Sequence, residues 1–353
     1  MDNLEASVLS VYSDVSPSRT DAESDSDWNA LVARRTVALV HRLKILPELF
    51  TGKSLLDLGI GTGEYAAVYA LWGAHVSGVD FNPASIDRAK QFFFDRGGEV
   101  SKNLNELTTS SVSEWEPKPH SYDICTSDGV LHHLSDPREG LEKLCAALKP
   151  GGLLYVSVGH PAGSLQRDLM AQIVKDRSGN LAQAVRVAED LFPEYMERAT
   201  TYGFRTAEQV VSDNFLVPQD VRMPASWWVQ ELDAQGVDLF TSWPSLLPEV
   251  PEPVTVPPVD PRDPVALVAM DRHTSSWAWS RDDSLTVLKH FIDDDETNGH
   301  ADGWPTELQA VLEAMRGPQD VLKRVLLATE LFGRGYCGLG DLNLVGRKRV
   351  AAQ

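Results

Sequence analysis

The fold of this chain is decided by the stretch 55-LLDLGIGTGEY-65, in which an apolar run ends in three closely spaced glycines. SLLDLGI is typical of a buried strand, and EYAAVYALWG, after the glycines, is typical of a helix that Gly73 terminates. Glycines at such a bend allow a tight turn and let a ligand approach the backbone. The stretch therefore predicts a strand, a ligand-binding bend and a helix.

The same alternation continues to about residue 160. HVSGVDF, ELTTSSV, YDICTSDG and LLYVSVG are expected strands, and PASIDRAKQFFFDRG and REGLEKLCAALK are expected helices. A further helix is expected ahead of this unit, from an N-cap at Asp27 to about Leu46. Alternating strands and helices predict a parallel sheet, and ligands on such sheets bind at the carboxyl ends of the strands.

An acidic residue follows the glycines at a distance that suits an adenosine ligand. Asp80 ends the next strand, 23 residues after Asp57, where a carboxylate can accept both ribose hydroxyls. The glycines also fit a dinucleotide fingerprint in the register that begins at Gly61 and ends at Ala66. However, a pyrophosphate favours a positive helix end, and Glu64 opens this helix. The pattern favours S-adenosylmethionine, which joins a cationic amino group to an adenosine and carries no phosphate.

Residues 53–160 resemble class I S-adenosylmethionine-dependent methyltransferases of the broad ubiquinone-biosynthesis and small-molecule type. DLGIGTG resembles their first motif, GVDFNPASIDRAK their second, SDGVLHHLSDP the segment after the fourth strand, and LKPGGLLYVSV the fifth strand with its lead-in. The resemblance implies a Rossmann-like α/β fold with a seven-stranded methyltransferase sheet. VDLFTSW and GLGDLNLVGRKR would be the sixth strand and the antiparallel seventh, with the RKR near the end as a solvated strand end.

The resemblance also implies ten cofactor-binding residues, position by position: Asp57, Gly59, Gly61, Gly63, Asp80, Phe81, Ser111, Val112, Ser127 and Asp128. The first four would contact the methionine part, Asp80 the ribose and Phe81 the adenine. The family often has an acidic residue where this chain has Ser111, whose hydroxyl can still form a hydrogen bond with the adenine amino group. The last two would lie near the sulfonium.

Two histidines are candidates for a catalytic base, which helps when the methyl acceptor is a hydroxyl or a charged amine. Asp128-Gly-Val-Leu-His132 resembles the D-x-x-L-H segment of phosphoethanolamine methyltransferases, whose histidine is the base. An equally weighted alternative makes His132 a helix-start residue bonded to backbone, and that alternative is favoured for His133. His160, at the end of the fifth strand, is the second candidate. Tyr12 is a further hypothesis, as a residue that folds over the site.

The expected domains follow from these elements. Residues 1–27 form a mobile acidic leader, and 28–243 plus 337–353 form the cofactor-binding domain, which includes a helical substrate-side insertion at 161–222. Residues 244–336 form a proline-rich connector and a helical cap between the last two strands. Both insertions together are expected to cover the substrate, and His273 and Asp213 are candidate polar contacts there.

Composition limits the partners. The formal net charge of the 353 residues is −19, so nucleic acid and anionic membrane are disfavoured. The three cysteines have no metal-ligand or redox spacing, and no metal site is expected. The first residues, MDNLEASVLS, lack the pattern of a signal peptide, and no apolar run approaches the ~20 residues of a membrane span, which favours the cytoplasm.

The sequence thus predicts methyl transfer from S-adenosylmethionine to an O or N nucleophile of a small molecule, in biosynthetic or secondary metabolism. Four alternatives stay open. They are a peptide or protein acceptor, a non-methylating reaction on the same cofactor fold, an NAD-dependent oxidoreductase, and a non-catalytic interaction protein. The oligomeric state is not predicted.

Overall fold

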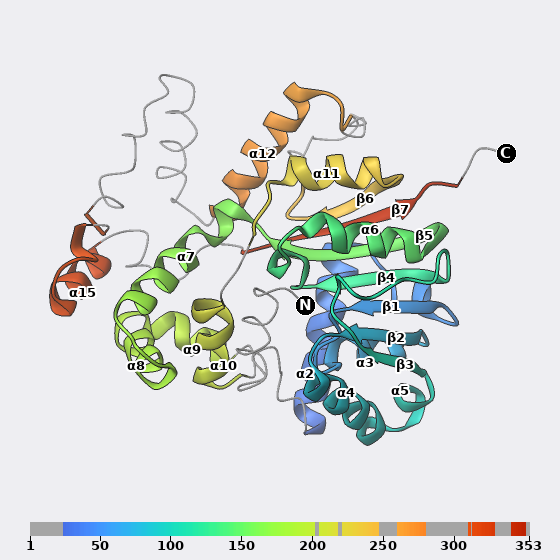
Figure 1. The fold of residues 1–353 in the computed structure, drawn as a ribbon, viewed down its shortest axis with the longest axis horizontal. Helices are drawn as coiled ribbons and strands as arrows, with labels where there is room; N and C mark the ends of the chain where they lie inside the picture. The colour runs from blue at the N-terminus through green and yellow to red at the C-terminus, as the bar shows by residue number, and fades with distance from the viewer. Residues whose placement is uncertain are drawn as a thin grey trace.

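A mixed seven-stranded sheet forms the centre of the molecule (Figure 1). The computed structural model describes residues 24–201, 205–217, 221–246, 260–279, 310–328 except 312, and 340–350. The strands are β1 (Ser54–Leu58), β2 (His75–Asp80), β3 (Leu104–Thr109), β4 (Tyr122–Asp128), β5 (Leu148–Gly159), β6 (Val237–Trp243) and β7 (Asp341–Lys348). Their order is β3-β2-β1-β4-β5-β7-β6, with β1 to β5 parallel and β7 antiparallel to both neighbours. The predicted methyltransferase sheet is confirmed.

Helices cover both faces of this sheet because successive strand residues point to opposite sides. Leu55 and Ile124 belong to the apolar core on one face, and their neighbours Leu56 and Cys125 belong to the core on the other. The first face carries α3 (Glu64–Leu71), α4 (Pro83–Arg96) and α5 (Gly98–Lys102), and the second carries α6 (Pro137–Ala147) and α11 (Ala225–Ala234). The carboxyl ends of the parallel strands therefore stay open between two packed layers.

A group of helices with its own apolar core lies beside the sheet. It consists of α7 (Pro161–Asp176), α8 (Leu181–Leu191), α9 (Pro193–Thr201) and α10 (Ala207–Val211), followed by a π-helical turn at Ser212–Leu216. α15 (Gln319–Ala328) joins the same core, and α12 (Pro264–Trp279) packs on α7 and α11 (Figure 1). The described parts of the segment between β6 and β7 thus lie against this helical group.

The first described helix differs from its prediction at both ends. α2 spans Asp25–Thr36 and continues as a π-helix at Val37–Arg42. Ser24, not Asp27, is the N-cap, because the Ser24 side chain accepts a hydrogen bond from the Asp27 amide. The serines and aspartates that follow one another here can all cap a helix, so the sequence pattern alone did not separate them.

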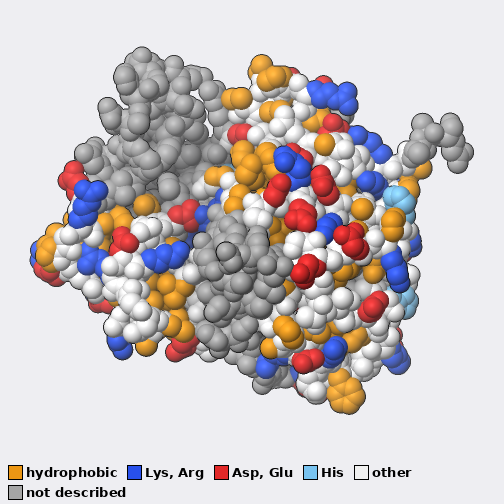
Figure 2. Space-filling view, viewed as in Figure 1, with side chains coloured by type: hydrophobic (Ala, Val, Ile, Leu, Met, Phe, Trp, Pro, Cys, Tyr) orange, Lys and Arg blue, Asp and Glu red, His pale blue; other side chains and the backbone are white. Residues whose placement is uncertain are grey.

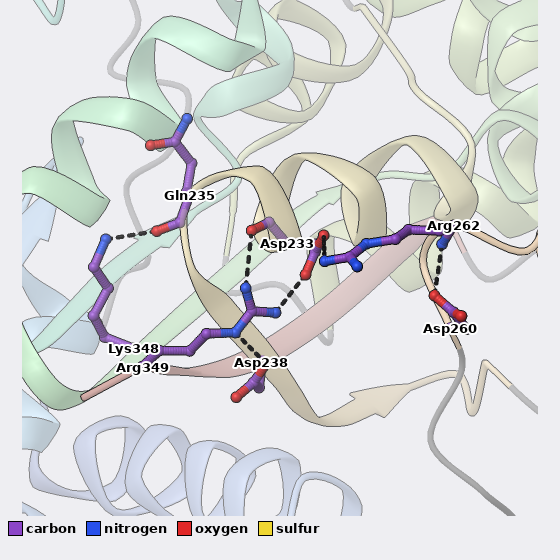
Figure 3. A network of polar contacts seen from close by, with 7 residues as sticks. All are labelled: Asp233, Gln235, Asp238, Asp260, Arg262, Lys348 and Arg349. Atoms are coloured by element: carbon purple, nitrogen blue, oxygen red, sulfur yellow. Dashed lines mark hydrogen bonds and ion pairs between the residues drawn. The ribbon is translucent and has the colours of Figure 1, made fainter. Parts of the chain in front are cut away.

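The basic C-terminal end of β7 is tied to α11 (Figure 3). Lys348 Nζ donates to the Gln235 carbonyl at 2.6 Å, and Arg349 pairs with Asp233 and with Asp238, the latter at 2.7 Å. The predicted strand end is largely exposed to solvent, and its cations in addition bind the end of α11, where carbonyls lack partners.

The charged side chains on one face of the molecule form no continuous patch of one sign. Acidic and basic groups alternate over the described part of this face (Figure 2). None of the helices in the described part of the chain is long and apolar enough to cross a membrane.

Candidate active site

A cavity of about 390 Å³ opens at the carboxyl ends of β1, β2, β3 and β4. Its size lies within the range of about 300–1,000 Å³ that is usual for small-molecule sites. Eight of the ten expected cofactor residues line it: Asp57, Gly59, Gly61, Asp80, Phe81, Ser111, Val112 and Asp128. The other two, Gly63 and Ser127, do not. The structure therefore brings the loops after four separate strands together around one space.

Gly59 and Gly63 are each required for a different close contact. Gly59 has a φ of 78°, and a Cβ there would overlap Val130 Cγ2, so its absence leaves room where the two lining loops meet. Gly63 is the N-cap of α3 with a φ of 86°, and its Cβ would lie 3.0 Å from Ala89 Cβ on α4. Gly63 therefore faces α4 and allows helices α3 and α4 to pack closely, and it does not line the cavity.

Asp80 is held in place by the backbone of two loops. Its Oδ2 accepts the Gly61 N–H and its Oδ1 accepts the Asn82 N–H, each at 2.9 Å. Burial raises the pKa of Asp80, and the two backbone donors oppose that effect. A carboxylate has about four acceptor positions, so both oxygens can still accept a hydroxyl.

Asp57 carries a strongly perturbed carboxyl. It is buried at the end of β1, and Thr126 Oγ1 donates to its Oδ1 at 2.7 Å. Burial raises the pKa of Asp57 to about 7, and the negative charge of Asp128 adds to the rise. A cation that enters the cavity at this carboxylate would stabilise its ionised form.

Asp128 is paired with an arginine that sequence reasoning missed. Arg35 Nη1 lies 2.7 Å from Asp128 Oδ2, and the Tyr155 hydroxyl donates to the same oxygen at 3.2 Å. The Arg35 guanidinium also lies over the rings of Tyr65 and Tyr69. A signal was present: Arg35 stands between Leu31 and Leu39 at four-residue steps, on the buried side of the helix.

Two predicted serines have their hydroxyls engaged within the protein. Ser111 Oγ accepts the Glu114 N–H at 3.2 Å and lies 2.9 Å from Ser113 Oγ. Ser127 is fully buried, and its Oγ donates to the Leu58 carbonyl at 2.9 Å. Ser127 therefore joins β4 to β1 and does not face the cavity.

Neither histidine predicted as the base lines the cavity. His132 Nδ1 accepts the Gly159 N–H at 3.1 Å, and His160, the N-cap of α7, accepts the Gly163 N–H at 3.3 Å. Burial lowers the pKa of His132 well below its ordinary value and that of His160 to about 4. Because Nδ1 accepts a hydrogen bond, Nε2 of each neutral ring carries the hydrogen and has no lone pair to offer. His133 lines the cavity instead.

The helix end that a phosphate would need is occupied. Glu64 is buried in the first turn of α3, and Thr62 Oγ1 donates to its Oε2 at 2.6 Å. A carboxylate at this position repels a pyrophosphate, and it already interacts with the positive end of the helix dipole that a phosphate would need. The residues thus fit a phosphate-free adenosine and do not fit a dinucleotide.

The insertion before α11 adds two side chains to the lining, Arg205 and Asp213. Asp213 was a candidate contact from the sequence, whereas Arg205 was missed. The other lining residues that sequence reasoning did not name include Arg34, Thr62, Tyr65 and Leu134.

Comparison with known proteins agrees with this geometry. Residues 30–203 match a family model described as a methyltransferase domain. The chain is 33% identical over 106 residues to the ubiquinone biosynthesis O-methyltransferase of Marinobacter nauticus, which covers 30% of this chain and 44% of that protein. It is 31% identical over 134 residues to the enzyme of the same name from Coxiella burnetii, with 37% and 55% covered.

The chain therefore spans about half the length of these curated relatives. A solved S-adenosylmethionine-dependent methyltransferase from Mesorhizobium loti is 14% identical, with 92% of this chain and 99% of that chain covered, but its TM-score of 0.41 is too low to bear on fold or function. The family model and the observed strand order agree, and the chain belongs to the class I S-adenosylmethionine-dependent methyltransferases, with its methyltransferase domain over residues 30–203.

Proposed function

We propose that this chain transfers a methyl group from S-adenosylmethionine to a hydroxyl oxygen of a small molecule. The observation that carries the proposal is Asp80, a buried carboxylate fixed by two backbone N–H groups in a cavity whose helix end rejects phosphate. The two curated relatives are named as O-methyltransferases, which supports oxygen as the acceptor atom.

The cavity offers a partner for each part of the cofactor. Asp57 would bind the α-ammonium, Asp80 the ribose hydroxyls, and Phe81 and Val112 the adenine faces. When bound, S-adenosylmethionine supplies a methyl group already activated on a sulfonium. The protein then has to orient the acceptor and exclude water.

His133 is the side chain in the described lining that best suits proton transfer from the acceptor hydroxyl. It is half-buried, it lines the cavity, and its ring lies 4.3 Å from that of His132. For His132 or His160 to act as the base, each would have to give up its bond to Gly159 or Gly163. Methyl transfer by the His133→Gln variant should be slower at unchanged cofactor affinity.

The helical group α7–α10 would form the substrate-side wall, because Arg205 and Asp213 come from it. The described parts of the later insertion, in α12 and α15, contribute no lining residue and would support that wall from outside. Of the expected leader, only residues 24–27 are described, and Tyr12 lies outside the described residues.

Calorimetric titration with S-adenosylhomocysteine tests the cofactor site. We expect Asp80→Ala to weaken binding at least tenfold, since each lost hydrogen bond to a charged group costs about 1.5–3 kcal/mol. Asp87→Ala, on the exposed side of α4, is the matched control and should bind as the natural protein does. Equal affinity in all three proteins, or tight binding of NAD, would overturn the assignment.

Incubation with cofactor labelled on its methyl group tests the reaction. Transfer of the label to an added catechol or phenol, with release of S-adenosylhomocysteine, supports the proposal. A transformed acceptor without label would indicate a non-methylating reaction on the same fold.

A further inference from the structure

Arg205 is a cation that the helical insertion places in the wall of the cofactor cavity. It precedes α10, and its backbone N–H bonds to the Thr200 carbonyl at 3.2 Å. Its Nη2 donates to the Gln209 carbonyl at 3.0 Å and to Asp213 Oδ2 at 2.8 Å. The side chain is 16% exposed, so these bonds hold a mostly buried guanidinium in one orientation.

The other edge of this guanidinium has donors to spare. Arg205 Nη1 forms no hydrogen bond within the described part of the chain, whereas Nε is enclosed by protein atoms and is out of reach of a ligand. An arginine presents five N–H donors in a planar fork, and the two side-chain bonds above both start from Nη2. The two N–H donors of Nη1 are therefore available to a ligand in the cavity that Arg205 lines.

The free donors of Arg205 suit an anion. Both hydrogens of Nη2 are used by Gln209 and Asp213, so Arg205 would bind a carboxylate through Nη1, and the guanidinium stays charged at any physiological pH. Asp213 fixes one side of Arg205, so the ligand would bind from the cavity side. His133, the proposed base, lines the same cavity, and so does the cofactor residue Asp57.

We propose that Arg205 binds a carboxylate of the methyl acceptor, which makes the substrate a hydroxylated carboxylic acid. The inference rests on the proposed function and deepens it. The carboxylate of the cofactor's own methionine part has the same chemistry and is the competing source. Arg205 belongs to the substrate-side insertion, whereas the residues expected at the methionine part follow β1 and β4.

The test uses the full chain saturated with S-adenosylhomocysteine and two probes of one shape, 4-hydroxybenzoate and 4-hydroxybenzamide. Binding is measured by ligand-observed NMR titration for the natural protein, for Arg205→Gln, and for Arg186→Gln, which removes an exposed arginine of α8. We expect the natural protein and Arg186→Gln to bind the acid at least tenfold more tightly than the amide. Arg205→Gln should lose this preference, a change of about 1.4 kcal/mol or more.

Titrations of each protein with S-adenosylhomocysteine and with 5′-methylthioadenosine, which lacks the amino-acid part, separate the two sources. Unchanged affinity for both nucleosides in Arg205→Gln shows that the variant is folded and supports the proposal. Weaker binding of S-adenosylhomocysteine alone would assign Arg205 to the cofactor and overturn it. Equal binding of acid and amide by the natural protein would also overturn it, while failure of all proteins to bind S-adenosylhomocysteine would instead refute the proposed function.

Discussion

Protonation of Asp57 should control cofactor affinity near neutral pH. This carboxyl belongs to β1 and is buried beside Thr126 of β4. Burial raises its pKa to about 7, and the charge of Asp128 raises it further. The ionised form would attract the α-ammonium of the cofactor, whereas the protonated form would not. Binding should therefore strengthen as pH rises and should release a proton.

The size of the effect follows from the pKa. At pH 6 about nine in ten Asp57 side chains are protonated, and at pH 8 about one in ten are. If only the ionised form binds, the apparent affinity for S-adenosylhomocysteine falls about tenfold from pH 8 to pH 6, or about 1.4 kcal/mol. Burial also raises the pKa of Asp80, but two backbone N–H donors favour its ionised form.

Calorimetry at pH 6, 7 and 8, in two buffers with different ionisation enthalpies, measures both the affinity and the protons released. Asp57→Asn should bind weakly at every pH and lose the pH dependence. Asp80→Asn should bind S-adenosylhomocysteine weakly but retain the pH dependence of the affinity. A natural protein whose affinity is equal at pH 6 and pH 8, or an Asp57→Asn variant with the full tenfold change, would refute the reasoning.

Three stability predictions can be tested by urea denaturation. Gly59→Ala should lower the free energy of unfolding by about 2–5 kcal/mol, because of its left-handed φ and the overlap with a neighbouring valine. Gly52→Ala, at a positive φ with open space around the added Cβ, should lower it by only about 1–2 kcal/mol, and equal losses would contradict the overlap. Arg35→Met should lower the free energy of unfolding by about 3 kcal/mol, because it leaves the partly buried carboxylate of Asp128 without its cation. An unchanged urea midpoint would show that water replaces that cation. Arg349→Ala should lower the free energy of unfolding by less than about 1 kcal/mol, since its ion pairs are exposed and screened by solvent. A larger loss would mean that the polar contacts between the end of β7 and α11 act cooperatively.

The sheet could be predicted because each strand carries its signal locally. All seven expected strands are present, including Val237–Trp243 and Asp341–Lys348, which lie far apart in the sequence and pair in the sheet. The start of α2 could not be placed, because Ser24 and Asp27 are equally good caps and only one of them bonds the helix. Short-range chemistry thus predicts that an element exists better than it predicts where the element begins.

Some residues of the site could likewise be predicted from the sequence, and others could not. Asp57 and Asp80 were predictable because both end parallel strands, and such ends meet at one edge of the sheet. His132 and His133 have identical chemistry, and only the geometry of the turn at Leu131–His133 decides which ring faces the cavity. Arg205 was not predictable, because its place in the lining depends on how the insertion packs against the sheet.

The charges of the lining explain why Asp57 would receive the cation. Five carboxylates line the cavity, and four of them have partners that offset their charge: Glu64 at the start of α3, Asp80 on two backbone N–H groups, Asp128 on Arg35, and Asp213 on Arg205. Within the described part of the chain, Asp57 has the Thr126 hydroxyl as its only hydrogen-bond partner, and Arg35 offsets its charge without forming an ion pair with it. The least compensated charge of the cavity therefore lies at Asp57, whose pKa is raised mainly by burial and further by the charge of Asp128. A single positive ligand group therefore gains most at Asp57, and the proposed carboxylate would bind at Arg205, on the wall that the helical insertion adds.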